Sequence, residues 1–100
     1  MATYVVLINF TEKGIQNIKE STERSEAFDR TVRNAGGTVR DIFWTLGSYD
    51  GVVVLDMPDD ESATALMISI GALGNVRSET LRAFDVEEFS EIVKKLPSIS

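Results

Sequence analysis

An α+β fold of the ferredoxin-like kind, with elements in the order βαββαβ and an added C-terminal helix, is predicted by three observations. Residues 3–10 and 51–57 are each apolar on both alternating sets of positions, which is typical of strands covered on two faces. Each is followed by a helical pattern and then by a more polar strand pattern. Residues 46–50, which join the second and third strands, are too few for a parallel crossover. We therefore expect the apolar strands at the centre of the sheet and the polar strands at its edges.

The elements of the first half are indicated by caps and breaks. Thr11 is expected to cap a helix after the first strand, and Glu12 supplies the acidic residue favoured in a first turn. The apolar spacing of this helix is interrupted near residue 21, so we expect two helical pieces. The second piece ends at the sequence NAGG, where glycine permits a left-handed conformation. Residues 38–45 then mix charged with apolar side chains, as an edge strand does.

The second half repeats this order. The strand at residues 51–57 ends before a proline, and one of the two aspartates that follow is expected to cap a helix with an apolar stripe. A glycine-rich turn closes that helix, and residues 76–84 form the second edge strand. Asp85, with Glu88 three residues later, has the spacing of a capping box and predicts the last helix.

The length and composition indicate a single globular domain that spans residues 1–100. A chain of this size holds one core. The hydrophobic share of 43% and the charged share of 26% are ordinary for a folded soluble protein. No apolar run approaches the roughly 20 residues of a membrane helix, and the first residues carry no secretory signal. We expect a cytoplasmic protein that does not bind a membrane.

The residue types that are missing exclude several chemistries. The chain has no cysteine and no histidine, which rules out disulfides, thiolate nucleophiles, Ser-His-Asp arrangements and metal sites built on these ligands. The acidic stretch DMPDDE lacks the spacing of a calcium loop, so neither a metal nor a cofactor is expected. The net charge of −6 opposes nucleic-acid binding, and the four arginines from Arg24 to Arg40 are interleaved with acidic residues.

The two strands that are apolar on both faces predict an oligomer. In a ferredoxin-like fold the helices cover only one face of the sheet. The other face would then be a large exposed apolar patch unless something packs on it. A second copy of the chain, packed sheet to sheet, is the simplest cover. We therefore expect a homo-oligomer, a dimer or higher.

Three stretches of the sequence resemble the GYD domain family, which is named for a glycine-tyrosine-aspartate signature. They are TYVVLINFTEKGI, WTLGSYDGVVVLDMPDDE and ALGNVRSETLRAF, in the order expected for the family and over nearly the whole chain. The signature is matched here as Gly47, one intervening residue, Tyr49 and Asp50. The resemblance implies a small fold similar to the dimeric α/β-barrel proteins, whose sheets pack across an interface and enclose ligand cavities. It implies no particular reaction.

Four residues are the candidate ligand-binding residues: Trp44, Tyr49, Asp50 and Arg77. In one interpretation Asp50 orients or deprotonates a hydroxyl at the mouth of a cavity. In the other, which we favour, it accepts backbone N–H groups and sets a turn. Trp44 either stacks on a ligand or anchors the core or an interface. Arg77 either binds a carboxylate through two hydrogen bonds or forms an ion pair on an edge strand.

Two functional hypotheses follow. The first is an oligomer whose sheet-to-sheet interface encloses a small-molecule pocket near these four residues, used for binding or for cofactor-free chemistry. The second is an oligomeric structural or regulatory module without a pocket, in which the same residues set turns and interfaces. An open pocket with convergent polar groups favours the first, and a filled interior favours the second. The sequence assigns no reaction, so whether the protein is an enzyme stays open.

Overall fold

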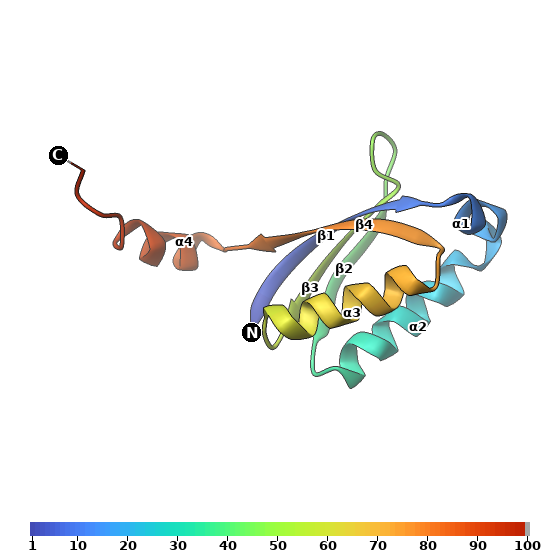
Figure 1. Ribbon diagram of the computed structural model, residues 1–100, viewed down its shortest axis with the longest axis horizontal. Coiled ribbons are helices and arrows are strands. Elements are labelled where there is room, and N and C mark those ends of the chain that lie inside the picture. Colours follow the sequence, from blue (N-terminus) through green and yellow to red (C-terminus); the bar gives the residue numbers. More distant parts are fainter. Residues whose placement is uncertain (100) are drawn as a thin grey trace.

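The computed structural model describes residues 1–99 and has the predicted ferredoxin-like order of elements (Figure 1). Four strands form one antiparallel sheet in the order β2-β3-β1-β4. The elements are β1 (Ala2–Phe10), α1 (Glu12–Gln16), the 3₁₀ turn η1 (Ile18–Glu20), α2 (Ser21–Asn34), β2 (Thr38–Trp44), β3 (Gly51–Met57), α3 (Asp60–Ala72), β4 (Val76–Ala83) and α4 (Val86–Val93).

The starts of α3 and α4 are capped by residues that the sequence predicts. Asp59 caps α3, because its side chain accepts a 2.7 Å hydrogen bond from the backbone N–H of Ser62. Asp85 and Glu88 form the predicted capping box at the start of α4. The interruption expected near residue 21 is the short turn η1, which joins α1 to α2.

The core lies between the sheet and the two long helices, α2 and α3, which cover the same face (Figure 1). β1 and β3 send every second side chain into it, as their central position requires. Val32 of α2 and Leu66 of α3 close it from the helix side. Its buried residues are Tyr4, Val6, Val32, Val53, Leu55, Met57, Ala63 and Leu66.

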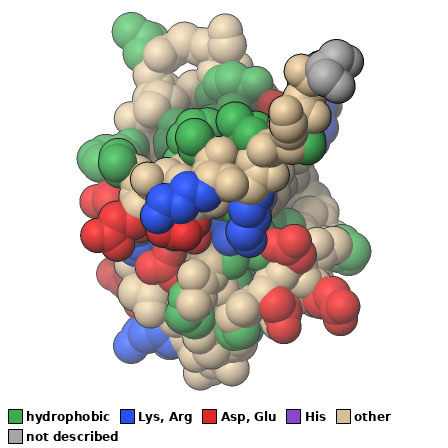
Figure 2. All heavy atoms as spheres, turned by 90° about the vertical axis from the view of Figure 1, so that its left-hand side faces the viewer, with side chains coloured by type: hydrophobic (Ala, Val, Ile, Leu, Met, Phe, Trp, Pro, Cys, Tyr) green, Lys and Arg blue, Asp and Glu red, His purple; other side chains and the backbone are tan. Residues whose placement is uncertain are grey.

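The opposite face of the sheet has no helix over it. The antiparallel register aligns its side chains in rows across the strands. The two middle rows are Asp41, Val54, Val5 and Leu81, and Phe43, Val52, Leu7 and Glu79; we call their six apolar residues the open face. Phe43 is 57% exposed and Leu81 is 42% exposed. In Figure 2, hydrophobic side chains gather above a band of acidic and basic ones.

α4 projects from the sheet beyond the end at which β1 begins (Figure 1). The molecule is consequently 55 Å long on its longest axis and 20 Å on its shortest. α4 buries none of its residues, and Phe89 on its apolar stripe is 57% exposed. None of the helices within residues 1–99 has the length and apolar character needed to cross a bilayer.

Candidate functional site

The loop that carries the glycine-tyrosine-aspartate signature, residues 45–50, is fastened to β1 by Asp50. The carboxylate of Asp50 accepts a 2.9 Å hydrogen bond from the backbone N–H of Phe10. The backbone N–H of Asp50 donates to the carbonyl of Ile8 at 2.8 Å, and its carbonyl accepts from the N–H of Thr45 at 2.9 Å. Asp50 therefore closes the loop and joins it to the last residues of β1, which is the geometry of the turn interpretation.

Tyr49 lies beside β4. Its hydroxyl donates a 3.2 Å hydrogen bond to a carboxylate oxygen of Glu79, and its carbonyl accepts from the hydroxyl of Thr45 at 2.6 Å. The hydrogen bond to Glu79 and the negative charge of that carboxylate raise the pKa of Tyr49. Gly47 has a φ of +124°, a backbone conformation that residues other than glycine rarely adopt. The displaced glycine of the signature thus occupies the position in the loop that needs it.

The helix α1 begins against the turn between α3 and β4. The backbone N–H of Thr11 donates to the carbonyl of Asn75 at 3.1 Å. The ammonium group of Lys13 donates to the carbonyl of Leu73 at 2.8 Å. Gly14 is buried at this contact, and a Cβ there would overlap the carbonyl oxygen of Asn75. The three stretches that carry the family resemblance therefore meet at one end of the sheet, although they are far apart in the sequence.

A cavity of about 200 Å³ lies between the helix-covered face of the sheet and the helices α2 and α3, next to this end. Ala27 and Gly51, which carry little or no side chain, are among the residues that line it. Most of the lining side chains are apolar, and Arg24 is the charged one. The lining residues are Ile8, Phe10, Ser21, Arg24, Ser25, Ala27, Phe28, Thr31, Ile42, Phe43, Trp44, Gly51, Val52, Val53, Met67, Ile70, Leu73, Asn75 and Val76; Phe43 and Val52 belong both to this lining and to the open face.

The structure separates the four candidate residues. Trp44 lines the cavity, whereas Tyr49, Asp50 and Arg77 are outside its lining as far as residues 1–99 define it. Arg77 pairs with Asn9 in the sheet register, on the face away from the helices. The cavity is therefore on the opposite side of the sheet from the interface at which we expected a pocket. A ligand-binding role for Tyr49, Asp50 and Arg77 stays a prediction.

Arg24 is the lining residue that the sequence reasoning missed. In the sequence it is one of four arginines interleaved with acidic residues. The available signal was its spacing: Arg24, Phe28 and Thr31 stand at helical intervals on the stripe of α2 that faces the sheet, and all three line the cavity. A cation on an apolar stripe is uncommon enough to mark a site.

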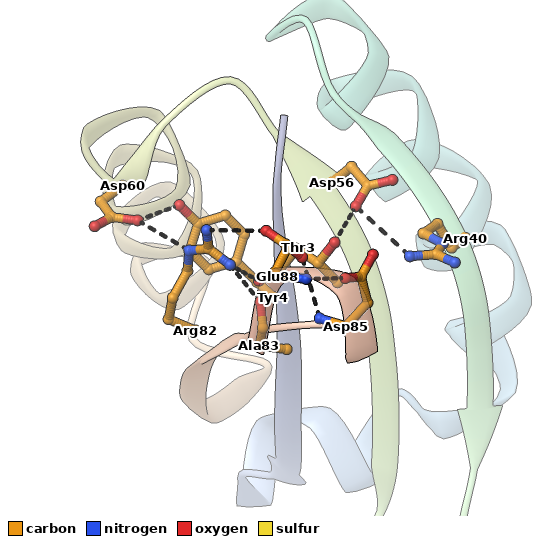
Figure 3. A network of polar contacts seen from close by, with 9 residues as sticks. All are labelled: Thr3, Tyr4, Arg40, Asp56, Asp60, Arg82, Ala83, Asp85 and Glu88. Carbon is orange, nitrogen blue, oxygen red and sulfur yellow. Dashed lines mark hydrogen bonds and ion pairs between the residues drawn. The ribbon is translucent and has the colours of Figure 1, made fainter. Parts of the chain in front are cut away.

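A second polar cluster lies near the start of β1, at the other end of the sheet (Figure 3). The hydroxyl of Tyr4 donates to a carboxylate oxygen of Asp60 on α3. The guanidinium of Arg82 lies 5.7 Å from the centre of the Tyr4 ring and 4.4 Å from that of Phe84. Arg82 also lies 3.9 Å from Asp60 and 3.8 Å from Glu88 of α4. This cluster ties α3, β4 and α4 to the first strand.

Burial raises the pKa of Tyr4 to about 12, and its hydrogen bond to Asp60 adds to the effect. Unfolding returns the pKa to about 10, so between pH 10 and 12 the unfolded chain loses a proton that the folded chain keeps. The free energy of unfolding is therefore expected to be insensitive to this group below pH 10 and to fall as the pH rises to 12.

Urea unfolding of the wild type and of Tyr4→Phe, at several pH values, measures this contribution. The difference in stability between the two proteins should shrink from pH 10 to pH 12, because only the wild type carries the shifted phenol. Lysine titration and Tyr49 affect both proteins alike and cancel in the difference. A difference that stays constant over this range would show that the Tyr4 hydroxyl ionises as freely as in the unfolded chain.

Comparison with known proteins connects this geometry to one family. The chain matches the GYD domain over residues 4–93. It is 28% identical over 89 residues to the "Glutamine synthetase and cystathionine beta-lyase binding protein" of Thermus thermophilus, a match that covers 88% of this chain and 94% of that protein.

Solved structures show the same fold. The crystal structure of TTHA0845 from Thermus thermophilus is similar with a TM-score of 0.56 and 26% identity, over 86% of this chain and 96% of that one. The crystal structure of FFRP-DM1 is similar with a TM-score of 0.61 and 15% identity, over 84% of this chain and 100% of that one. At 15% identity the second likeness concerns the fold alone.

Proposed function

Since this chain belongs to the GYD domain family, we propose that it is a homo-oligomeric binding protein that holds a small apolar molecule between its sheet and helices. The observation that carries the proposal is the cavity of about 200 Å³ beneath α2 and α3. The Thermus relative is named for binding two enzymes, which supports a binding role for this chain.

The size and walls of the cavity define the ligand. An apolar protein cavity of about 150 Å³ is large enough to admit benzene, so the present one fits a substituted aromatic ring or a branched chain of similar size. Phe28, Met67 and Ile70 supply apolar walls that favour such a body. Trp44, at the end of β2, is the residue that we expect to stack on a ring.

Asp50 and Tyr49 hold the strands that line the cavity rather than lining it themselves. Asp50 connects the ends of β1 and β3, and both strands contribute lining residues such as Ile8 and Gly51. We therefore treat Asp50 as a positioning residue. Tyr49 holds the same loop against β4 through Glu79.

A second copy of the chain, packed on the open face, is the other part of the proposal. A single chain leaves the six apolar residues of the open face without cover, and the acidic Asp41 and Glu79 flank them at the two edges of the sheet. A stable interface buries about 800 Å² on each partner, which is a little over a tenth of the 6952 Å² surface of this chain. The open face has residues on all four strands, which supports an interface of this kind.

Filling the cavity tests the small-molecule part. Ala27→Leu adds three carbon atoms at an exposed lining position of α2, and we expect it to weaken binding of 3-phenylpropionamide, a neutral probe, by at least about tenfold. Ala65→Leu is the matched control, because Ala65 is an exposed residue of α3 outside the lining residues. Both changes keep a good helix former.

Trp44 reports binding directly, because it is the only tryptophan of the chain and lines the cavity. Titration of the probe should change its fluorescence in the wild type and in Ala65→Leu, with the same affinity. If the wild type and Ala27→Leu both fail to bind this probe and a wider panel of aromatic and branched compounds, the cavity is not a binding site. The structural or regulatory module without a ligand is then the correct hypothesis.

A further inference from the structure

One charged group occupies the wall of the otherwise apolar cavity, the guanidinium of Arg24. Its Nη1 donates a 2.8 Å hydrogen bond to the backbone carbonyl of Asn17, which fixes the group at the junction of α1 and η1. Its Nη2 is shielded from solvent and has no hydrogen-bond partner among the described residues. Within residues 1–99, no carboxylate lies close enough to Arg24 to form an ion pair.

A shielded guanidinium nitrogen without a partner is costly, because removing a charged donor from water is offset only by a hydrogen bond in its place. None of the described residues accepts a hydrogen bond from this Nη2, so an acceptor from outside the chain would complete the site. A negatively charged acceptor compensates the cation best.

We propose that Arg24 binds the carboxylate of a small carboxylic acid whose apolar body fills the cavity. This inference rests on the proposed small-molecule function and specifies the chemical class of the ligand. A planar carboxylate matches the planar fork of a guanidinium. A phosphate, with up to two negative charges, would leave charge uncompensated, because the lining residues contain one cation.

The acidic surface of the protein favours carboxylic acids with an apolar body over small polar acids. With a net charge of −6, the chain repels anions over most of its surface, so an anion that enters the cavity needs a local cation and an apolar contact together. Phe28 and Met67 provide the contact within the same lining. Acids with an aromatic or branched body satisfy both requirements, whereas small polar acids satisfy only the first.

A matched pair of probes tests the assignment. Isothermal titration calorimetry compares 3-phenylpropionate with 3-phenylpropionamide, which has the same body and no charge. The wild type should bind the acid at least about tenfold more tightly than the amide, as expected for a hydrogen bond between charged groups. Arg24→Gln should weaken binding of the acid by at least about tenfold and leave that of the amide nearly unchanged.

Arg30→Gln is the matched control, because Arg30 is an exposed arginine of α2 that is absent from the lining among residues 1–99. It should bind both probes as the wild type does. Arg24→Lys, a second variant, should keep a smaller preference for the acid, because it retains the charge and loses the fork. If Arg24→Gln does not fold, the test is whether the wild type prefers the acid to the amide and whether Arg24→Lys reduces that preference.

The outcomes separate this inference from the proposed function. Equal affinity of the wild type for acid and amide, unchanged in Arg24→Lys, overturns the role of Arg24 and leaves the cavity as a site for neutral molecules. Binding of the acid that Ala27→Leu does not weaken overturns it as well, because the acid then binds elsewhere. Failure of the wild type to bind any aromatic or branched probe overturns both proposals together.

Discussion

Gly14→Ala is expected to lower the free energy of unfolding by about 3 kcal/mol or more. Alanine is the better helix former and would by itself favour α1 by about 1 kcal/mol. That gain is smaller than the cost of the clash, because the new Cβ would overlap the carbonyl oxygen of Asn75. The oxygen belongs to the backbone and already accepts from the N–H of Thr11, so it cannot move away without breaking that contact. Chemical denaturation monitored by circular dichroism measures this decrease in the free energy of unfolding.

Gly71→Ala is the matched control for this substitution. Gly71 also lies in a helix, α3, but a Cβ there has no described atom within 4 Å. Alanine at this exposed position should leave the stability unchanged or raise it by up to about 1 kcal/mol. A Gly14→Ala protein as stable as Gly71→Ala would show that α1 does not pack tightly on the turn between α3 and β4.

Val5→Lys is expected to convert the proposed homo-oligomer into a folded monomer. Val5 is at the centre of the open face, between Val54 on β3 and Leu81 on β4. In a single chain this face is open, so the lysine stays hydrated and the fold is kept. In a symmetric pair each copy would bury one ammonium group against an apolar surface, at a cost of about 3 kcal/mol or more, which raises the dissociation constant at least about 100-fold.

Sedimentation velocity over a range of micromolar concentrations measures this change. Ile68→Lys is the control, because Ile68 is 68% exposed on α3, on the other side of the sheet. It should sediment as the wild type does, while Val5→Lys should sediment as one chain. A well-folded wild-type monomer at these concentrations would remove the second copy from the proposed function, and the open face would then be an exposed surface of a monomeric protein.

The strand order was predictable because two simple signals agree. Apolar residues on both sides of β1 and β3 identify the central strands, and the short loop at residues 45–50 requires β2 and β3 to be antiparallel. Asp85 and Glu88 predicted the start of α4 from spacing alone. Each of these signals lies within a few residues of the feature that it predicts, so the sequence displays it directly.

The candidate site was less predictable because it depends on distant contacts. The partner of the Asp50 carboxylate is a backbone N–H 40 residues earlier, which no local pattern reveals. The cavity is a space that the side chains of α2, α3 and the sheet fail to fill, so it depends on the packing of whole elements. Trp44 lines this cavity, whereas the sequence predicts a pocket at the sheet-to-sheet interface.

The edge strand β2 limits how these molecules can associate. Its pairing with β3 is interrupted between Val39 and Asp41, so a bulge carries the charged Arg40 at this edge. The other edge, β4, carries Arg77, Glu79 and Arg82. Charges and a bulge on an outer strand hinder another chain from extending the sheet sideways. If a second copy packs on the open face, as we propose, the pair is closed by its own symmetry, and the charged edges disfavour growth of the sheet into fibres.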